Sequence, residues 1–329
     1  MILAGDIGGT KTILALFEEK GAGLRPVRDA TFANADHGTF KEVLKLFLRE
    51  ETASSVESGC FGVAGAVING RTRMTNLNWE LNESVLAEAL GVKRVKLLND
   101  LAATAYGMVH LSPDDLKALN PAGQKGTGNI AVIAAGTGLG EAMLYWDGSQ
   151  YQPSASEGGH ADFAPRSDLE IKLLRYLREK LKGRVSYERV LSGPGLLNIY
   201  SFLRDSAHGT EPPWLTEKLK TGDPSATISQ LGVTREEPLC TEALDLFTSI
   251  YGAEAGNLAL KCLATGGVYV GGGIAPKILP ALERGAFLNS FGDKGRFSPL
   301  LKRMELKVSL NPGTALLGAA HFARRVKNA

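Results

Sequence analysis

The stretch that decides the fold is residues 1–20, MILAGDIGGTKTILALFEEK, in which two apolar runs flank a glycine turn. Residues 2–7 and 11–18 are rich in the apolar and β-branched residues that form strands, and Gly8-Gly9-Thr10 separates them. Glycine permits the tight backbone conformations that a hairpin turn requires. This stretch therefore predicts two paired strands, and an extended stretch at about 26–34 adds a third to the meander.

The rest of the first hundred residues alternates between helical and extended patterns, which predicts a mixed sheet covered by helices. The expected elements are a helix whose face is Phe40, Val43, Leu44 and Phe47, strands at 59–65 and 66–75 with a turn at Asn69-Gly70, a helix at 82–91 and a strand at 93–98.

The pattern of strand, glycine turn and strand returns about 130 residues later. Residues 129–135 and 141–146 are strand-like, and GTGLG (136–140) lies between them. This recurrence suggests two related halves. Further along we expect a helix from Ser167 to Gly183, an irregular and exposed stretch at 205–238, a long helix at 241–265, and a strand at 266–274 that runs into a triple-glycine turn and then a helix.

Composition bounds the function. The 329 residues predict two domains, and 37 basic against 35 acidic residues leave a net charge of +2. No basic field drives nucleic-acid binding, and no apolar run reaches the ~18 residues of a membrane helix. The N-terminus lacks the basic region of a signal peptide. Cys60, Cys240 and Cys262 form no C-x-x-C pair. We therefore expect reduced cysteines and a cytoplasmic protein without membrane or nucleic-acid partners.

The first glycine turn has the composition of a phosphate-binding loop. Backbone N–H groups of successive glycines form an anion-binding nest, and Thr10 and Lys11 add a hydroxyl and a positive charge. Asp6 could hold Mg²⁺ through water. Gly136–Gly140 has the same character, and Gly271-Gly272-Gly273 offers a flat backbone to a nucleoside. Each turn alone is equally consistent with a plain hairpin, whereas the three together favour a nucleotide site.

Asn99-Asp100 stands where the strand at 93–98 ends and a helix begins. Asn or Asp at this junction is a good helix N-cap, which is the structural interpretation. The functional interpretation is that a carboxylate at the carboxyl end of a strand accepts a proton from a substrate hydroxyl.

Two further acids and a histidine suit a sugar. Glu157 and His160 lie three residues apart across two glycines, without the third ligand that zinc needs. An acid and an imidazole can each fix a sugar hydroxyl, and Glu188 can do the same. The structural interpretations are a surface loop for the first two and an acid in the first turn of a helix for Glu188.

Six motifs in order resemble the bacterial glucokinase family of the actin-like ATPase superfamily. They are DIGGTK (6–11), LLNDLAATAYG (97–107), AAGTGLG (134–140), EGGHADFAP (157–165), ERVLSGPGL (188–196) and GGVYVGGGI (266–274), and the resemblance continues to NPGTALLGAA (311–320). It implies an α/β fold of two ribonuclease-H-like domains, with mixed sheets, helical cover and an interdomain cleft. The expected domains are 1–106 plus 311–329, and 107–310.

The resemblance also implies residue roles for the ATP-dependent phosphorylation of glucose at its 6-hydroxyl. Asp100 would be the general base, and Asn99, Asp100, Glu157, His160 and Glu188 would bind glucose. The expected contacts to ATP are Gly5, Asp6, Ile7, Gly8, Gly9, Thr10 and Lys11, then Gly136, Thr137 and Gly138, then Gly271, Gly272 and Gly273, with Asp6 holding Mg²⁺ through water.

Departures from the family pattern are few. Ala135 replaces the glycine usual before GTGLG, and Lys11 stands where some relatives carry Asn. The cysteine-rich zinc motif C-x-C-G-x-x-G-C of the related repressor and kinase group is absent, so we expect ATP and Mg²⁺ but no zinc. We also expect a homodimer. The alternatives are a kinase of another hexose (mannose, fructose or an N-acetylhexosamine), a non-sugar actin-like ATPase, and a sugar-responsive regulator, for which no DNA-binding segment is seen.

Overall fold

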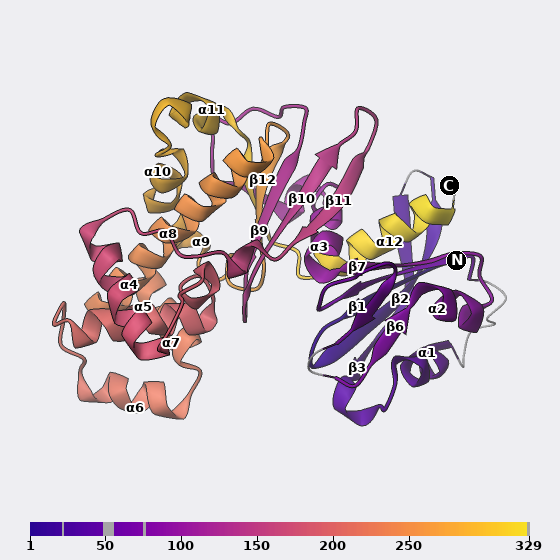
Figure 1. The fold of residues 1–329 in the computed structure, drawn as a ribbon, viewed down its shortest axis with the longest axis horizontal. Helices are drawn as coiled ribbons and strands as arrows, with labels where there is room; N and C mark the ends of the chain where they lie inside the picture. Colours follow the sequence, from indigo (N-terminus) through magenta and orange to yellow (C-terminus); the bar gives the residue numbers. More distant parts are fainter. Residues whose placement is uncertain (22, 49–55, 75–76, 328–329) are drawn as a thin grey trace. The chain divides into compact units, whose positions relative to one another are not determined.

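The computed structural model describes residues 1–21, 23–48, 56–74 and 77–327. It contains two compact units (Figure 1). The first comprises residues 1–115, 143–155 and 311–329, and the second comprises 116–142 and 156–310. Each unit is described by itself.

The first sheet has the strand order β3-β2-β1-β4-β7. Its strands are β1 (Ile2–Ile7), β2 (Lys11–Lys20), β3 (Gly23–Ala33), β4 (Ser58–Val63) and β7 (Val95–Asn99). The first three strands pair antiparallel, and β1 with β4 and β4 with β7 pair parallel. The predicted meander followed by a mixed sheet is therefore confirmed.

The two faces of β1 follow the period of two that a strand imposes. Ile2 and Ala4 pack with α12 (Thr314–Lys327), whereas Leu3 and Ile7 pack with α1 (Phe40–Leu48) and α2 (Glu83–Leu90). Helix α3 (Asp100–Met108) crosses α12 closely, and glycine permits this approach. A Cβ on Gly107 or Gly318 would collide with the backbone of the other helix. This packing fixes the start of α3, where Asp100 lies, against the sheet.

The stretch expected as a strand at 66–75 is shorter. Residues Asn69 and Gly70 form a turn with φ values of 50° and 69°, as the sequence predicts, but only a single bridge joins Ile68 to Arg71 across it. The strand β5 is confined to Arg71–Arg73, and its partner is β6 (Glu80–Asn82). Residues 75–76 lie outside the described part of the chain.

The second sheet has the order β11-β10-β9-β12-β13-β8, so its first five strands repeat the order of the first sheet. They are β11 (Tyr151–Ser156), β10 (Leu139–Trp146), β9 (Ile130–Ala135), β12 (Gly267–Gly271) and β13 (Leu306–Ser309), followed by β8 (Leu116–Ala118). The two related halves that the repeated glycine turns suggested therefore share the same order of strands.

Helices form about half of the second unit. They are α4 (Asp168–Leu181), α5 (Gly193–Asp205), α6 (Pro213–Thr221), α7 (Pro224–Thr234), α8 (Pro238–Cys262), α9 (Leu279–Leu282), α10 (Ala286–Gly292) and α11 (Ser298–Arg303). The expectation of an irregular stretch at 205–238 is wrong, because two helices lie there, although most of its residues are exposed as expected. Pro213 and Pro224 are the first residues of α6 and α7, where proline favours a helix, and Leu215 and Ile228 are fully buried. The triple glycine is followed by turns, and the expected helix begins only at Leu279.

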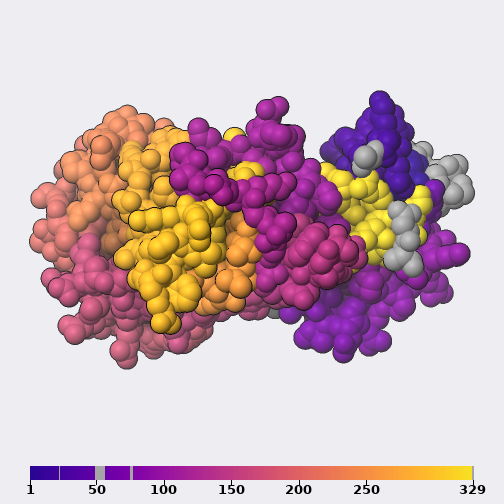
Figure 2. All heavy atoms as spheres, turned by 90° about the horizontal axis from the view of Figure 1, so that it is seen from above, coloured from indigo at the N-terminus to yellow at the C-terminus, as the bar shows by residue number. Residues whose placement is uncertain are grey.

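The compact units differ from the expected domains at two segments. Residues 107–115 and 143–155, expected in the second domain, are grouped with the first unit. Two contacts explain this: Asn311 donates to Asp115 at 3.2 Å, and Arg325 donates to the carbonyl oxygen of Tyr151 at 2.9 Å. Figure 2 shows α12, in yellow, beside the indigo residues of β2 and β3. Within the described residues, every helix is too short or too polar to span a membrane.

Candidate active site

The first glycine turn is held by a buried asparagine. Gly8 N–H donates to the carbonyl oxygen of Lys11 at 3.0 Å, which closes the turn between β1 and β2. Asn34, 1% exposed, donates through its side-chain amide to the carbonyl oxygen of Gly8 at 2.9 Å, accepts from the Thr12 hydroxyl at 2.7 Å, and donates its backbone N–H to Thr10 at 2.9 Å. The turn is therefore pre-formed.

Asp6 lies at the end of β1, beside this turn. Burial raises the pKa of the Asp6 carboxyl, and the charge of Lys11 acts in the opposite direction. No described residue donates a hydrogen bond to this carboxyl group, so its oxygens are available to a hydrated cation. Oxygen ligands of this kind suit Mg²⁺, which keeps several of its waters when it binds.

Asn99 is the N-cap of α3, so the structural interpretation holds for this residue. Its side-chain oxygen accepts from the N–H groups of Leu101 and Ala102 at 2.9 and 3.3 Å, and its amide donates to Gly65 at 3.2 Å. Asp100 is the first residue of α3, and one of its oxygens accepts from Leu101 N–H at 2.8 Å. Capping by Asn99 thus leaves the Asp100 carboxylate at a helix N-terminus, where negative charge is favoured.

The second unit brings Glu157, His160 and Glu188 together. The two imidazole nitrogens of His160 lie 4.0 Å from carboxylate oxygens of Glu157 and Glu188. The side chains of Glu157 and His160 are 64% and 56% exposed and remain open to a ligand. Among the described residues, no three His, Cys, Asp or Glu side chains gather as metal ligands. The three side chains of the cluster carry groups that can form hydrogen bonds with a ligand.

The second glycine turn is joined to this cluster. Glu188 accepts from the N–H of Leu139 at 3.1 Å, and a Cβ on Gly138 would collide with the Glu188 carboxylate. Within the turn, Gly136 N–H donates to Gly138 at 2.8 Å. Gly272, with φ of 81°, packs so closely on Ala135 that a Cβ there would collide with its backbone. The second and third glycine segments are thus adjacent, as a nucleotide site would need.

Two residues at these turns were missed from the sequence. Asn34 lies 26 positions from Gly8, and only the pairing of β2 with β3 brings the two together. Glu141 follows the second glycine turn directly and reads there as an ordinary strand residue, yet it is 1% exposed. An acid that immediately follows a glycine turn and lies within an apolar strand was the available signal.

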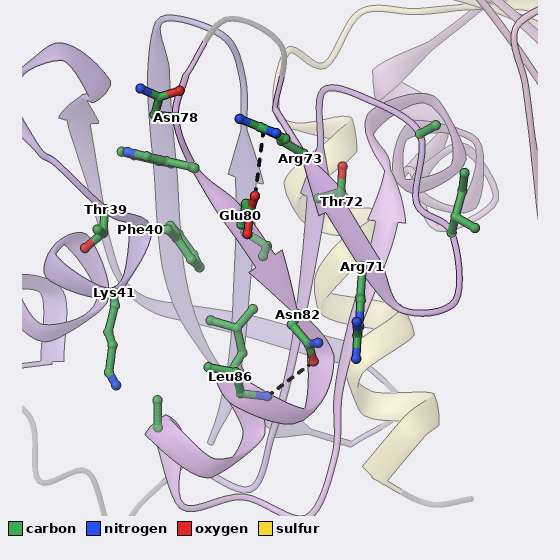
Figure 3. Close-up of a pocket in the computed structure, with 16 residues that line it drawn as sticks. Thr39, Phe40, Lys41, Arg71, Thr72, Arg73, Asn78, Glu80, Asn82 and Leu86 are labelled. Carbon is green, nitrogen blue, oxygen red and sulfur yellow. Dashed lines mark hydrogen bonds and ion pairs between the residues drawn. The ribbon is translucent and has the colours of Figure 1, made fainter.

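A pocket of about 690 Å³ in the first unit contains none of the predicted site residues. Figure 3 shows that it lies between α1, α2 and the β5–β6 pair, with an ion pair of 3.8 Å between Arg73 and Glu80 at its side. Trp79 and Phe40 form part of its apolar lining. This pocket is therefore not part of the candidate active site.

Comparison with known proteins places the chain in one family. Residues 3–326 match the family model described as glucokinase. A glucokinase from Nostoc sp. (strain PCC 7120) is 44% identical over 340 residues, which cover 99% of each chain. The crystal structure of a glucokinase from an Antarctic psychrotroph is 31% identical, with a TM-score of 0.85 and 98% of each chain covered.

A more distant structure has the same fold. It is a ROK family glucokinase from Streptomyces griseus in complex with glucose and AMPPNP, with 20% identity, a TM-score of 0.65, and coverage of 98% of this chain and 99% of that one. The full-length match to the family model and to the Nostoc relative decides the assignment, and the chain belongs to the glucokinase family.

Proposed function

We propose that this enzyme transfers the γ-phosphoryl group of ATP to the 6-hydroxyl of D-glucose, with Asp100 as the general base. Family membership gives glucose phosphorylation itself. The observation that supports the residue roles best is the link between Glu188 and the second glycine turn, because one side chain there serves both the hydroxyl-binding cluster and a phosphate-type loop.

Glucose is assigned to Glu157, His160 and Glu188 of the second unit and to Asn99 and Asp100 of the first. The carboxylates accept hydrogen bonds from sugar hydroxyls, and His160 accepts or donates according to its tautomer. Because Asn99 already caps α3 through its oxygen, its contribution to the sugar is through the amide that otherwise donates to Gly65. These contacts orient the 6-hydroxyl for attack.

Asp100 accepts the proton of the 6-hydroxyl as the oxygen attacks the γ-phosphorus. The new O–P bond forms while the bond from the γ-phosphorus to its bridging oxygen breaks, so that glucose 6-phosphate and ADP are the products. Positioning and charge neutralisation supply most of the catalysis in phosphoryl transfer. Asp100 lies in the first turn of α3, where the N-terminus of a helix favours a negative charge.

The phosphates of ATP are assigned to the backbone of two glycine turns, Gly5–Lys11 and Gly136–Gly138, and the nucleoside to Gly271–Gly273. AMPPNP, bound in the Streptomyces griseus protein, is an analogue of this donor. Asp6 would hold Mg²⁺ through water, and the ion would neutralise charge on the phosphates. The carboxylate of Asp6, which is largely buried and accepts no hydrogen bond from the described residues, supports this placement.

The deciding experiment is a coupled assay with ATP and Mg²⁺ over a panel of hexoses. Glucose should exceed galactose and fructose by a wide margin in kcat/KM, up to ~10⁴-fold, because a missing or inverted hydroxyl leaves polar groups of the site unpaired. Mannose, which differs only at carbon 2, is the closest competitor. Equal efficiency on glucose and galactose would refute the assigned contacts. A rate of ATP hydrolysis that is the same with and without a hexose would support the non-sugar ATPase instead.

Zinc independence, a cytoplasmic location and a homodimer complete the proposal. The cysteines are all free, which suits a reducing compartment. Metal analysis of the purified protein should find no stoichiometric zinc, and a chelator that does not strip Mg²⁺ should leave the fold intact. Sedimentation at micromolar concentration should give twice the 35.0 kDa of the chain, and a single-chain mass would refute the dimer.

A further inference from the structure

Two glutamates are buried against the loop that carries Glu157 and His160. Glu141 on β10 is 1% exposed and Glu254 on α8 is fully buried. Their carboxyl groups interact directly. Two ionised carboxylates sharing a buried position repel each other strongly, so at most one of them carries a charge when the site is undisturbed.

The loop backbone rests on Glu141. Gly158 is the first residue of the short 3₁₀ helix Gly158–His160, and a Cβ at this glycine would collide with Oε2 of Glu141. The neighbouring Gly159 packs in the same way on the carbonyl oxygen of Leu139. No atom separates the Glu141 carboxyl from the loop, so any movement of that carboxyl is transmitted to Glu157 and His160.

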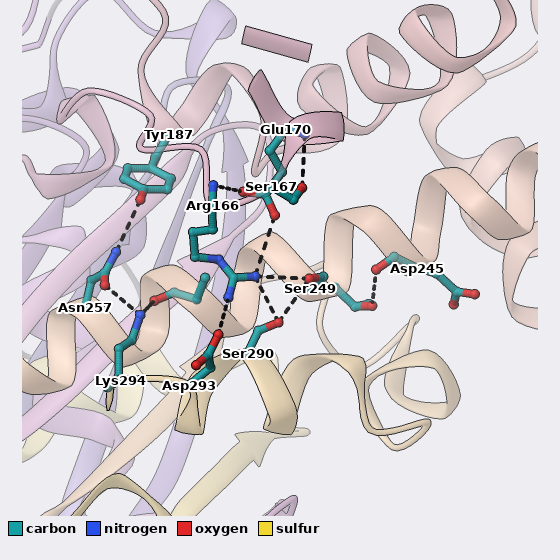
Figure 4. A network of polar contacts seen from close by, with 12 residues as sticks. Arg166, Ser167, Glu170, Tyr187, Asp245, Ser249, Asn257, Ser290, Asp293 and Lys294 are labelled. Atoms are coloured by element: carbon teal, nitrogen blue, oxygen red, sulfur yellow. Dashed lines mark hydrogen bonds and ion pairs between the residues drawn. The ribbon is translucent and has the colours of Figure 1, made fainter. Parts of the chain in front are cut away.

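Glu254 has the donors that a charge needs. It accepts from the Asn257 amide at 2.8 Å and from the Lys261 ammonium at 3.3 Å. Figure 4 shows Asn257 bridging Tyr187 and Lys294, with distances of 3.2 and 2.7 Å. Lys294 also interacts electrostatically with Glu254, and burial is the main cause that lowers the pKa of Lys294. Glu254 is therefore the member of the pair that has hydrogen-bond donors around its carboxyl group.

Glu141 has no such support. Its Oε1 accepts no hydrogen bond from any described residue. Burial and the charge of Glu254 raise the pKa of Glu141 to about 7, against a smaller opposing effect of Lys261. Tyr251 and Cys262 face the same carboxyl, and burial raises the pKa of both, so they stay neutral beside it. Glu141 therefore carries the proton, with the Glu254 carboxylate as its acceptor.

We propose that Glu141 is a positioning residue for the sugar, and that its proton, donated to Glu254, keeps the Glu157–His160 loop in the conformation that accepts glucose. Loss of the proton places two charges in one buried site. The Glu157–His160 loop is the segment that moves in response, because the side chains of Glu157 and His160 are more than half exposed, whereas strand β10 and helix α8 are packed in the core. This inference rests on the proposed function for the role of Glu157 and His160.

Steady-state kinetics from pH 6 to 9 test the proposal, with the native enzyme, E141Q and E237Q compared. In the native enzyme kcat/KM for glucose should fall above about pH 7 by up to about tenfold per pH unit, through KM rather than kcat. E141Q keeps a donor without a charge and should hold its KM constant. Effects of groups that touch the sugar are common to both proteins and cancel in the comparison.

E237Q is the matched control, because Glu237 is also a buried glutamate at α8. It caps the N-terminus of that helix, 17 residues or roughly 25 Å along the axis from Glu254, and should keep the native profile. A native KM that is constant over this range, or a rise of equal size in E141Q, would overturn the proposal.

Infrared spectroscopy of the resting enzyme tests the shared proton without any turnover. At pH 6 the native protein and E237Q should show the C=O band of a protonated carboxyl group that E141Q lacks, and the band should decline above about pH 7. Absence of this difference band overturns the proposal even if E141Q is inactive or unstable. An enzyme that shows the band but phosphorylates no hexose would instead refute the proposed function.

Discussion

The side-chain amide of Asn34 donates a 2.9 Å hydrogen bond to the carbonyl oxygen of Gly8, and the same side chain accepts from Thr12. One buried residue thereby ties the end of β3 to the first glycine turn. Two of the three residues of that turn are glycines without side chains, so its conformation depends on hydrogen bonds such as this one, and a fixed conformation keeps its backbone donors in place for an anion. We therefore propose that Asn34 is a positioning residue for the phosphates assigned to this turn.

Replacement of Asn34 by Ala should raise KM for ATP about tenfold and leave KM for glucose nearly unchanged, since loss of a buried hydrogen bond of about 1–3 kcal/mol loosens only this turn. Initial rates over a matrix of both substrates measure this. Asn82→Ala is the matched control: it removes the N-cap of α2 in the same unit and should cost about 1 kcal/mol of stability without changing either KM. Equal effects of the two changes on ATP would mean that Asn34 acts through stability alone.

Asp100→Asn should lower kcat by at least ~10²-fold with little change in the melting temperature, because the amide cannot take the proton whereas Asn99 still caps α3. The same substitution at Asp168, the first residue of α4, supplies the control. It repeats the change at an equivalent helix position without a proposed substrate nearby, so its kcat should stay native. Near-native turnover in Asp100→Asn would refute the role of Asp100 as general base and leave it a structural role in the first turn of α3.

The fold was predictable where local pattern decides it. The alternation of apolar residues gave β1, β2 and β9, and the repeat of strand, glycine turn and strand gave the shared topology of the two sheets. The helices in the stretch 205–238 were not predicted, because proline is common both in loops and at the first position of a helix. Pro213 and Pro224 occupy that first position in α6 and α7. Only the burial of Leu215 and Ile228, which depends on residues far along the chain, distinguishes a helix from a loop.

The grouping of the three side chains of the second-unit cluster was predictable from the sequence. Glu157, His160 and Glu188 were chosen by residue type and lie together in the structure. The supporting residues were not, because Asn34 and Glu141 act through contacts that no short motif contains. Asn34 reaches Gly8 across a strand pairing, and Glu254 meets Glu141 from a helix more than a hundred residues away.

His110 and His321 make the first unit sensitive to acid. Their rings stack 3.7 Å apart between α3 and α12, and burial lowers the pKa of His110 to about 4 and that of His321 to about 3, with Arg324 adding to both shifts. An unfolded histidine binds its proton near pH 6.5, so the unfolded chain gains protons first as pH falls. Stability should therefore be full above pH 6.5 and decrease below it, by about 2 kcal/mol for each imidazole at pH 5.

Chemical denaturation at pH 7 and pH 5 measures this loss. His110→Phe keeps a stacking ring without a titrating group and should reduce the decrease by about half. His37→Phe changes a histidine of the same unit that has an edge contact with Phe32 and lies outside this stack, and should behave as the native protein. An unchanged decrease in His110→Phe would show that the stacked pair does not carry the acid sensitivity.

Glu157 and Glu188 should separate sugar binding from nucleotide binding, because only one of them touches a glycine turn. Among the residues that the structure describes, the Glu157 carboxylate pairs only with His160, whereas Glu188 also accepts from Leu139 at the second turn. Glu157→Ala should raise KM for glucose by about 10- to 100-fold, as expected for a lost hydrogen bond to a charged group, and leave KM for ATP within about twofold. Glu188→Ala should raise both constants.

Isothermal titration with glucose and, separately, with AMPPNP gives the two affinities without turnover. Glu179→Ala, an exposed change on α4 in the same unit, should leave both affinities native and thereby exclude a general effect of losing a carboxylate. If Glu157→Ala weakened AMPPNP and kept glucose affinity, the Glu157–His160 loop would belong to the nucleotide. If Glu188→Ala affected glucose alone, the hydrogen bond to Leu139 would not shape the phosphate loop, and the two halves of the second-unit site would be independent.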